Sequence, residues 1–125
     1  MSTSPSRILR NVPKEEAFYF YTSIGNSTCQ DAASLDEFLA RIRDLNVASL
    51  EFHLYREDFE KWIAQILGDA KLAEEIRGLR ESKVVGSSLR YWLDFIVSRR
   101  LKDLKSSSSD KRKIYSNLVS EISSF

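Results

Sequence analysis

Cysteine and histidine are nearly absent from this chain, which has one of each, Cys29 and His53, in 125 residues. A single cysteine excludes an internal disulfide framework and any zinc site built from several thiolates. The four glycines are isolated, so none belongs to a phosphate-binding loop or a dinucleotide fingerprint. No stretch approaches the roughly 20 consecutive apolar residues of a transmembrane helix. We therefore expect no metal, no cofactor and no membrane span.

The composition is that of one globular domain. Apolar residues make up 42% of the chain and charged residues 30%, a balance too apolar for a disordered protein. The formal net charge of +1 hides an uneven distribution. Residues 1–82 carry 10 basic and 14 acidic side chains, whereas residues 83–125 carry 9 basic and 4 acidic ones. An acidic body is thus followed by a basic C-terminal segment.

An aromatic run near the N-terminus predicts a β-strand. In Ala17–Tyr21 the two phenylalanines share one face and the two tyrosines share the other. Turn-forming residues follow at 25–27, and a second short strand over Thr28–Ala32 would complete a hairpin.

From Ser34 onward, apolar residues recur at the spacing of amphipathic helices. Ser34 and Glu37 form a capping box, in which each side chain is expected to accept a hydrogen bond from the other residue's amide, and Asn46 is a plausible end of that helix. Ser49 and Asp58 are candidate caps for the next two helices. The sequence leaves open whether these two helices are separate.

Gly68 and Asp69 combine a helix-ending glycine with a helix-capping aspartate, which predicts a sharp corner between two helices. Further apolar stripes follow at Leu72, Ala73, Ile76 and Leu79, and at Leu89, Trp92, Leu93, Ile96 and Val97. The expected fold is mainly α: a bundle of five to six short helices with a small N-terminal β-strand or hairpin.

The polar N-terminus and a run of four serines suggest the domain boundaries. We expect a flexible N-terminal leader over 1–16, because it lacks the apolar run of a secretion signal, and a helical domain over 17–105. A serine-rich linker over 106–110 and an amphipathic helix over 111–125 would complete the chain. The apolar stripe of that last helix either folds back onto its own domain or packs on a partner, including a second copy in a homodimer.

His53 is the one candidate for catalysis, since Glu57 lies one helical turn later and Asp58 follows it. A metal site needs three or four ligands, and a general base needs a nucleophile or a substrate pocket, but the sequence supplies neither. Beside Phe52, a packing role with satisfied ring nitrogens is the favoured interpretation, although protonation of the ring could tune an interface. Cys29 is interpreted as an incidental free thiol, because no histidine or second thiol lies near it.

A basic cluster near the C-terminus is the main candidate binding surface. It consists of Arg99, Arg100, Lys102, Lys105, Lys111, Arg112 and Lys113. Such a cluster attracts phosphates or an acidic partner protein. The alternative, which we favour, is that these side chains are solvated or pair with the acidic body of the same molecule.

Residues 50–76 have a distinctive sequence: Leu-Glu-Phe-His-Leu-Tyr-Arg-Glu-Asp-Phe-Glu-Lys-Trp-Ile, followed by Leu-Gly-Asp and Leu-Ala-Glu-Glu-Ile. This sequence resembles the motif of a family of small uncharacterised prokaryotic proteins, many of them archaeal. Residues 18–39 also look like the N-terminal part of that family. The matching positions are Phe52, His53, Asp58, Phe59, Trp62, Gly68 and Asp69. The family is a domain of unknown function, so the resemblance implies a shared fold over residues 18–79 and no activity.

The sequence predicts a non-enzymatic, cytoplasmic interaction or regulatory module that binds a macromolecular partner, with protein partners or self-association expected and no small-molecule substrate evident. Nucleic-acid binding through the basic cluster is the first alternative. An enzyme centred on His53 is the second and is ranked last.

Overall fold

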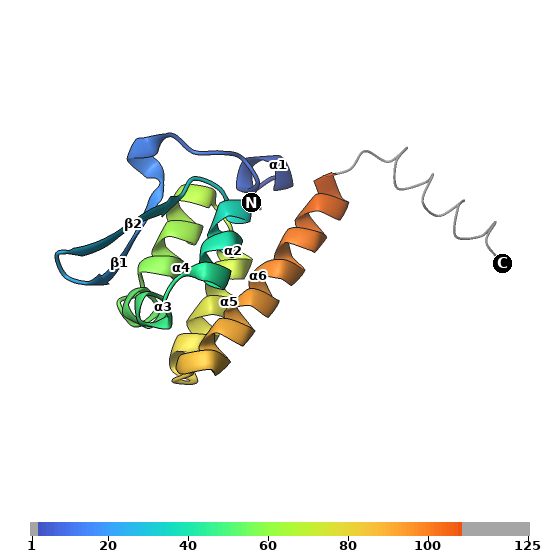
Figure 1. Cartoon of the computed structure of the whole chain (residues 1–125). Helices are drawn as coiled ribbons and strands as arrows, with labels where there is room; N and C mark the ends of the chain where they lie inside the picture. The colour runs from blue at the N-terminus through green and yellow to red at the C-terminus, as the bar shows by residue number, and fades with distance from the viewer. Residues whose placement is uncertain (1–2, 109–125) are drawn as a thin grey trace.

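The computed structural model describes residues 3–108, which form six α-helices and one two-stranded antiparallel sheet (Figure 1). The elements in chain order are α1 (Pro5–Ile8), the 3₁₀ turn η1 (Lys14–Glu16), β1 (Phe18–Ser23), β2 (Asn26–Ala32), α2 (Leu35–Asp44), α3 (Val47–Tyr55), α4 (Asp58–Trp62), the π-helical turn η2 (Ile63–Leu67), α5 (Ala70–Glu81) and α6 (Gly86–Ser108). The mainly α fold with an N-terminal hairpin is confirmed. None of the helices in this part of the chain combines the length and hydropathy needed to cross a membrane.

The predicted hairpin is present, and β2 begins two residues earlier than expected, at Asn26. As the alternation in sequence indicated, the two phenylalanines of β1 point into the core, while Tyr19 and Tyr21 are 46% and 36% exposed. The pairing of the strands is irregular, with register shifts on both sides of Tyr21. Cys29 in β2 adopts a left-handed backbone with φ of 60°.

Helix α2 begins at the predicted capping box, with one difference. The Ser34 hydroxyl accepts a hydrogen bond from the Glu37 amide, but the Glu37 carboxylate accepts from the amide of Ala33, at 2.8 Å, instead of that of Ser34. Both bonds satisfy backbone donors at the start of the helix, as capping requires.

The next two helices are separate, because Glu57 between α3 and α4 has a left-handed backbone with φ of 66°. Asn46, not the predicted Ser49, caps α3. Ser49 is instead fully buried inside α3. Asp58 is the first residue of α4, and its side chain bonds to His53 and Arg56, so it is not the cap that the sequence suggested.

The predicted corner at Gly68 and Asp69 is confirmed. Gly68 has φ of 85°, a conformation that glycine adopts without steric cost, and Asp69 accepts a hydrogen bond from the Leu72 amide. The Asp69 carboxylate also accepts two hydrogen bonds from Arg100, one from Nε at 2.8 Å and one from Nη2 at 3.1 Å. This ion pair joins the corner to α6.

The long helix α6 runs along one side of the molecule and contacts α1, α2, α3 and α5 (Figure 1). Its core-facing residues are Leu89, Leu93, Ile96, Val97, Leu101 and Leu104. Trp92, which the sequence assigned to the same stripe, is 45% exposed, and the neighbouring Tyr91 is 62% exposed. Both aromatic rings therefore lie on the solvent side of the helix, and for Trp92 the prediction was wrong.

Two predicted domain boundaries need correction. Within the expected leader, Ile8 and Val12 are buried in the core, and the Val12 amide donates to the carbonyl of Ala33. Residues 3–16 are thus part of the folded domain. At the other end, α6 continues to Ser108, so the expected linker begins inside a helix. The predicted helix over 111–125 lies outside the described residues.

Candidate functional site

The His53 imidazole joins the hairpin to the helices. It is 3% exposed; Nε2 accepts a hydrogen bond from the backbone amide of Tyr21 at 2.8 Å, and Nδ1 lies 2.8 Å from Oδ2 of Asp58. A backbone amide can only donate, so Nε2 carries no proton and Nδ1 donates its proton to the carboxylate. His53 is therefore held as the neutral tautomer with its proton on Nδ1.

Burial lowers the pKa of His53 below its ordinary value of 6.5. The hydrogen bond and charge of Asp58 oppose this shift, and the charge of Arg56 adds to it. With Nε2 occupied by Tyr21, neither ring nitrogen is free to take a proton from a substrate. This arrangement confirms the packing role predicted for the histidine, and of the two nearby carboxylates Asp58, not Glu57, is its partner.

A second residue of α3 holds the same point of the hairpin. The hydroxyl of Ser49 donates to the carbonyl of Tyr21 at 2.8 Å. Both backbone groups of Tyr21 on the edge away from β2 are thus bonded to side chains of α3. Strand β1 is fixed against α3 at this residue, which positions the tyrosine side chain at the surface.

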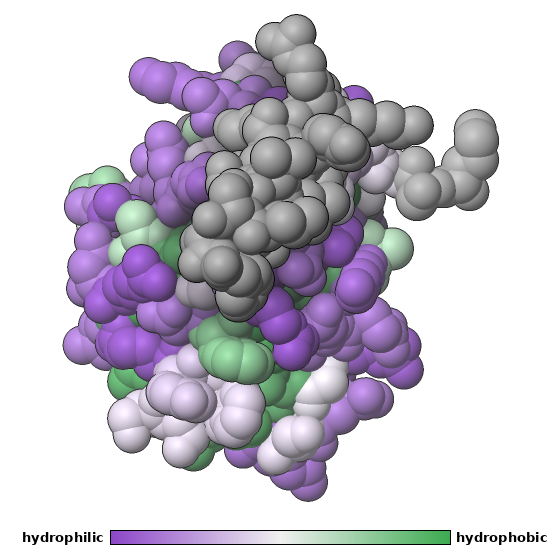
Figure 2. Space-filling model, turned by 90° about the vertical axis from the view of Figure 1, so that its right-hand side faces the viewer, coloured by the Kyte–Doolittle hydropathy of each residue, from purple (hydrophilic) through white to green (hydrophobic). Residues whose placement is uncertain are grey.

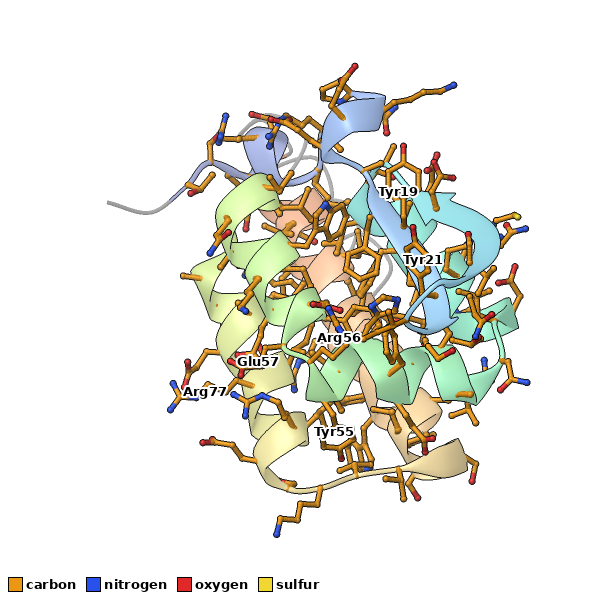
Figure 3. The ribbon with its side chains drawn as sticks, turned by 90° about the vertical axis from the view of Figure 1, so that its left-hand side faces the viewer. Tyr19, Tyr21, Tyr55, Arg56, Glu57 and Arg77 are labelled. Carbon is orange, nitrogen blue, oxygen red and sulfur yellow. The ribbon has the colours of Figure 1, made fainter. Side chains whose placement is uncertain are left out.

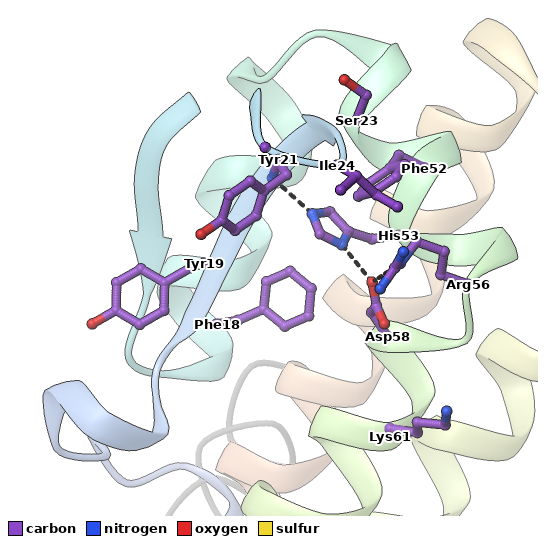
Figure 4. Close-up of a pocket in the computed structure, with 11 residues that line it drawn as sticks. Phe18, Tyr19, Tyr21, Ser23, Ile24, Phe52, His53, Arg56, Asp58 and Lys61 are labelled. Atoms are coloured by element: carbon purple, nitrogen blue, oxygen red, sulfur yellow. Dashed lines mark hydrogen bonds and ion pairs between the residues drawn. The ribbon is translucent and has the colours of Figure 1, made fainter. Parts of the chain in front are cut away.

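An open groove lies between the hairpin and the helices, next to this anchor point (Figure 4). Its volume is about 430 Å³, and most of its lining is apolar or aromatic. Phe18, Tyr19, Tyr21 and Ile24 line it from the hairpin; Phe52, His53, Arg56, Asp58 and Lys61 line it from the helical side. Figure 3 shows Tyr21 on the hairpin and Arg56 on the helical side of the same face.

The groove-lining residues that are most exposed were not singled out from sequence. Ile24, at the tip of the hairpin, is 82% exposed. Arg56 is half-exposed at the end of α3, and its guanidinium lies 5.0 Å from the centre of the Phe52 ring. An apolar residue directly before a predicted hairpin turn is the signal that points to Ile24, since such connecting segments favour polar residues. Arg56 has no comparable signal in the sequence.

The predicted basic cluster is largely neutralised within the described residues. Arg99 bonds to Glu75, Arg100 bonds to the buried Asp69, and Lys105 bonds to Asp36. The remaining described member of the cluster, Lys102, is exposed on α6. Lys111, Arg112 and Lys113 lie outside the described residues. Pairing with the acidic body, the interpretation favoured from sequence, accounts for the three paired side chains.

The solvent face of α6 carries an exposed aromatic ridge formed by Tyr91, Trp92 and Phe95. Trp92 lies edge-to-face against both neighbours, at 5.2 and 5.7 Å between ring centres, and Arg99 covers the Phe95 ring. Figure 2 views the side of the molecule on which α6 lies and shows white and green side chains gathered there below the grey atoms.

Metal-binding groups are not assembled in this part of the chain: residues 3–108 contain no cluster of three or more His, Cys, Asp or Glu side chains placed to hold an ion. Cys29 is exposed on β2. Comparison with protein-family models, with curated proteins and with solved structures finds no match. Kinship with the uncharacterised prokaryotic family therefore stays a prediction from residues 18–79.

Proposed function

We propose that this protein is a non-enzymatic interaction module that binds a protein partner through the groove between its β-hairpin and helices α3 and α4. The observation that supports this proposal most directly is the exposure of Ile24 and Tyr21 beside an apolar groove of about 430 Å³. Binding sites are typically concave and apolar, with a few polar groups at fixed positions. A second copy of this chain is among the protein partners that the proposal admits, and the cytoplasm is the proposed location.

The two alternatives fit the described residues less well. An enzyme centred on His53 lacks a free ring nitrogen, because Tyr21 and Asp58 occupy both. Nucleic-acid binding through the basic cluster requires cations that can reach phosphates. Arg100 is bonded through two nitrogens to Asp69, and Arg99 and Lys105 also have carboxylate partners.

The proposal is tested by selecting binders from a displayed random-peptide library with the full chain and by measuring their affinity for two variants. Ile24→Ser removes an exposed side chain from the groove and is expected to weaken binding at least about tenfold, since burial of such a side chain contributes roughly 1.5–3 kcal/mol. Val85→Ser is the matched control, because Val85 is also exposed, at 58%, but does not line the groove. It should leave affinity unchanged.

Equal affinity of the selected peptides for wild type and Ile24→Ser would refute the groove as the binding site. Fluorescence anisotropy with labelled single- and double-stranded DNA tests the first alternative. Binding that falls steeply with salt and is lost in Arg99→Glu would favour the nucleic-acid function over this proposal.

A further inference from the structure

Arg56 is held in place on two sides at the mouth of the groove. Its Nε donates to Oδ2 of Asp58 at 3.1 Å, and its guanidinium carbon lies 5.0 Å from the centre of the Phe52 ring. Asp58 is fixed in turn by Nδ1 of His53 at 2.8 Å (Figure 4). A guanidinium restrained in this way loses less conformational entropy when it binds a ligand than a free side chain does.

The outer end of the same guanidinium is available. Among the described residues, no acceptor bonds to Nη1 or Nη2 of Arg56, and the side chain is 49% exposed. These two nitrogens form a planar pair of donors, which matches the two oxygens of a carboxylate. Asp58 does not compete for this end, since its bonded oxygen faces Nε and His53.

The charged side chains that line the groove have a small positive balance, which suits an anion better than a cation. Its charged lining residues are Arg56, Asp58 and Lys61, which together carry one net positive charge. Within the same groove, Ile24, Tyr21 and Phe52 offer apolar surface. A ligand that uses both features needs an anionic group and an apolar side chain a short distance apart.

We propose that the groove binds an acidic peptide segment of a partner protein, in which an Asp or Glu carboxylate pairs with Nη1 and Nη2 of Arg56. An adjacent apolar side chain of the peptide packs between Ile24 and Phe52. This inference rests on the proposed function and adds the chemistry of the partner. The anion is a carboxylate, and the test below distinguishes it from a peptide phosphate.

The test uses synthetic peptides that share one sequence with a central Phe and differ only in the residue beside it, which is Glu, Gln, Lys or phosphoserine. Titration of the full chain should give a dissociation constant about tenfold lower for the Glu peptide than for the Gln peptide. A tenfold ratio corresponds to 1.4 kcal/mol, at the lower limit for hydrogen bonds to charged groups. The Lys peptide should bind most weakly.

Two variants locate the effect. Arg56→Gln should remove the preference for Glu over Gln, whereas Arg77→Gln should retain it, because Arg77 is equally exposed, at 48%, but lies on α5. The comparison of Glu and Gln peptides on the unmodified protein requires no variant, so it remains decisive if Arg56→Gln proves unstable.

The results of these titrations distinguish a failure of the acidic partner from a failure of the groove as a binding site. If Glu and Gln peptides bind equally well and both are weakened by Ile24→Ser, the acidic partner is refuted and the groove remains a binding site. If the phosphoserine peptide binds more than tenfold tighter than the Glu peptide, the carboxylate assignment is overturned. If no peptide of the set binds and library selection yields no groove binder, the proposed function falls as well.

Discussion

Nε2 of His53 accepts a hydrogen bond of 2.8 Å from the backbone amide of Tyr21, which lies 32 residues earlier in the chain. This single contact fixes the tautomer of the imidazole, attaches the hairpin to α3 and removes the nitrogen that general-base catalysis would need. It also makes the attachment sensitive to acid, because a proton on Nε2 would replace the acceptor with a donor that faces the Tyr21 N–H.

Acidification should destabilise the fold through His53. Its pKa is lowered in the folded state, so between that value and 6.5 the unfolded chain binds more protons than the folded one. The free energy of unfolding therefore falls as pH drops below about 6.5, and it stops falling below the folded pKa. Denaturant unfolding of the wild type between pH 5 and 8 should show this slope, and His53→Gln should lack it.

Asp94 does not interfere with this measurement. The hydrogen bond from Arg43 lowers the pKa of Asp94 below 3.8, outside the measured range. An identical pH slope in wild type and His53→Gln would contradict the role assigned to the histidine.

Removing the second anchor of the hairpin should also cost stability. In Ser49→Ala the carbonyl of Tyr21 loses the donor supplied by a fully buried serine, in a partly buried setting, and we expect a loss of about 1–3 kcal/mol in the free energy of unfolding. Ser88→Ala on α6 is the control, since Ser88 is exposed and should change stability by less than about 0.5 kcal/mol. Equal effects of the two substitutions in chemical denaturation would show that Ser49 does not hold the strand.

Neighbouring arginines of the predicted basic cluster should behave differently. Arg100→Ala leaves the carboxylate of Asp69, 1% exposed, without its cation, and we expect a loss of about 3–5 kcal/mol. Arg99→Ala breaks a half-exposed pair with Glu75 and should cost about 0–1 kcal/mol. Thermal or denaturant unfolding of both variants measures the contrast, and a fully stable Arg100→Ala protein would argue against a structural role for Arg100.

The two tryptophans should differ in accessibility to solvent. Trp62 is 7% exposed and donates its indole N–H to the carbonyl of Glu16, whereas Trp92 is 45% exposed on α6. Acrylamide should quench the fluorescence of Trp62→Phe, which retains Trp92, several-fold more than that of Trp92→Phe. Strong protection of Trp92 would mean that another surface covers the ridge of Tyr91, Trp92 and Phe95 in solution.

Local signals in the sequence predicted those parts of the fold that depend on neighbouring residues. The capping box at Ser34, the corner at Gly68 and Asp69 and the alternation in β1 all require only residues within a few positions of each other. The failures at Trp92 and Ser49 have a different origin. An apolar residue at the margin of a helical stripe, such as Trp92, is buried only if another element packs against that margin. A serine such as Ser49 bonds to a distant carbonyl only if the tertiary structure brings that carbonyl close.

The candidate site illustrates the same limit. His53 stood out in sequence by its rarity, but its partner Tyr21 is brought to it by the pairing of hairpin and helix. Arg56 lines the groove at the end of α3, just before Glu57 adopts a left-handed backbone that no feature of the sequence indicated. The role of a side chain that is positioned by long-range contacts can be assigned only from the tertiary structure.

The way in which the hairpin is anchored also limits how a partner can be recognised. A two-stranded sheet has two open edges at which another chain can add a strand. At Tyr21, the edge of β1 is already bonded to His53 and Ser49, and β2 is interrupted by the left-handed residue Cys29. Strand addition is disfavoured on both edges, so a bound peptide would be selected by the side chains of the groove and not by the backbone of the sheet.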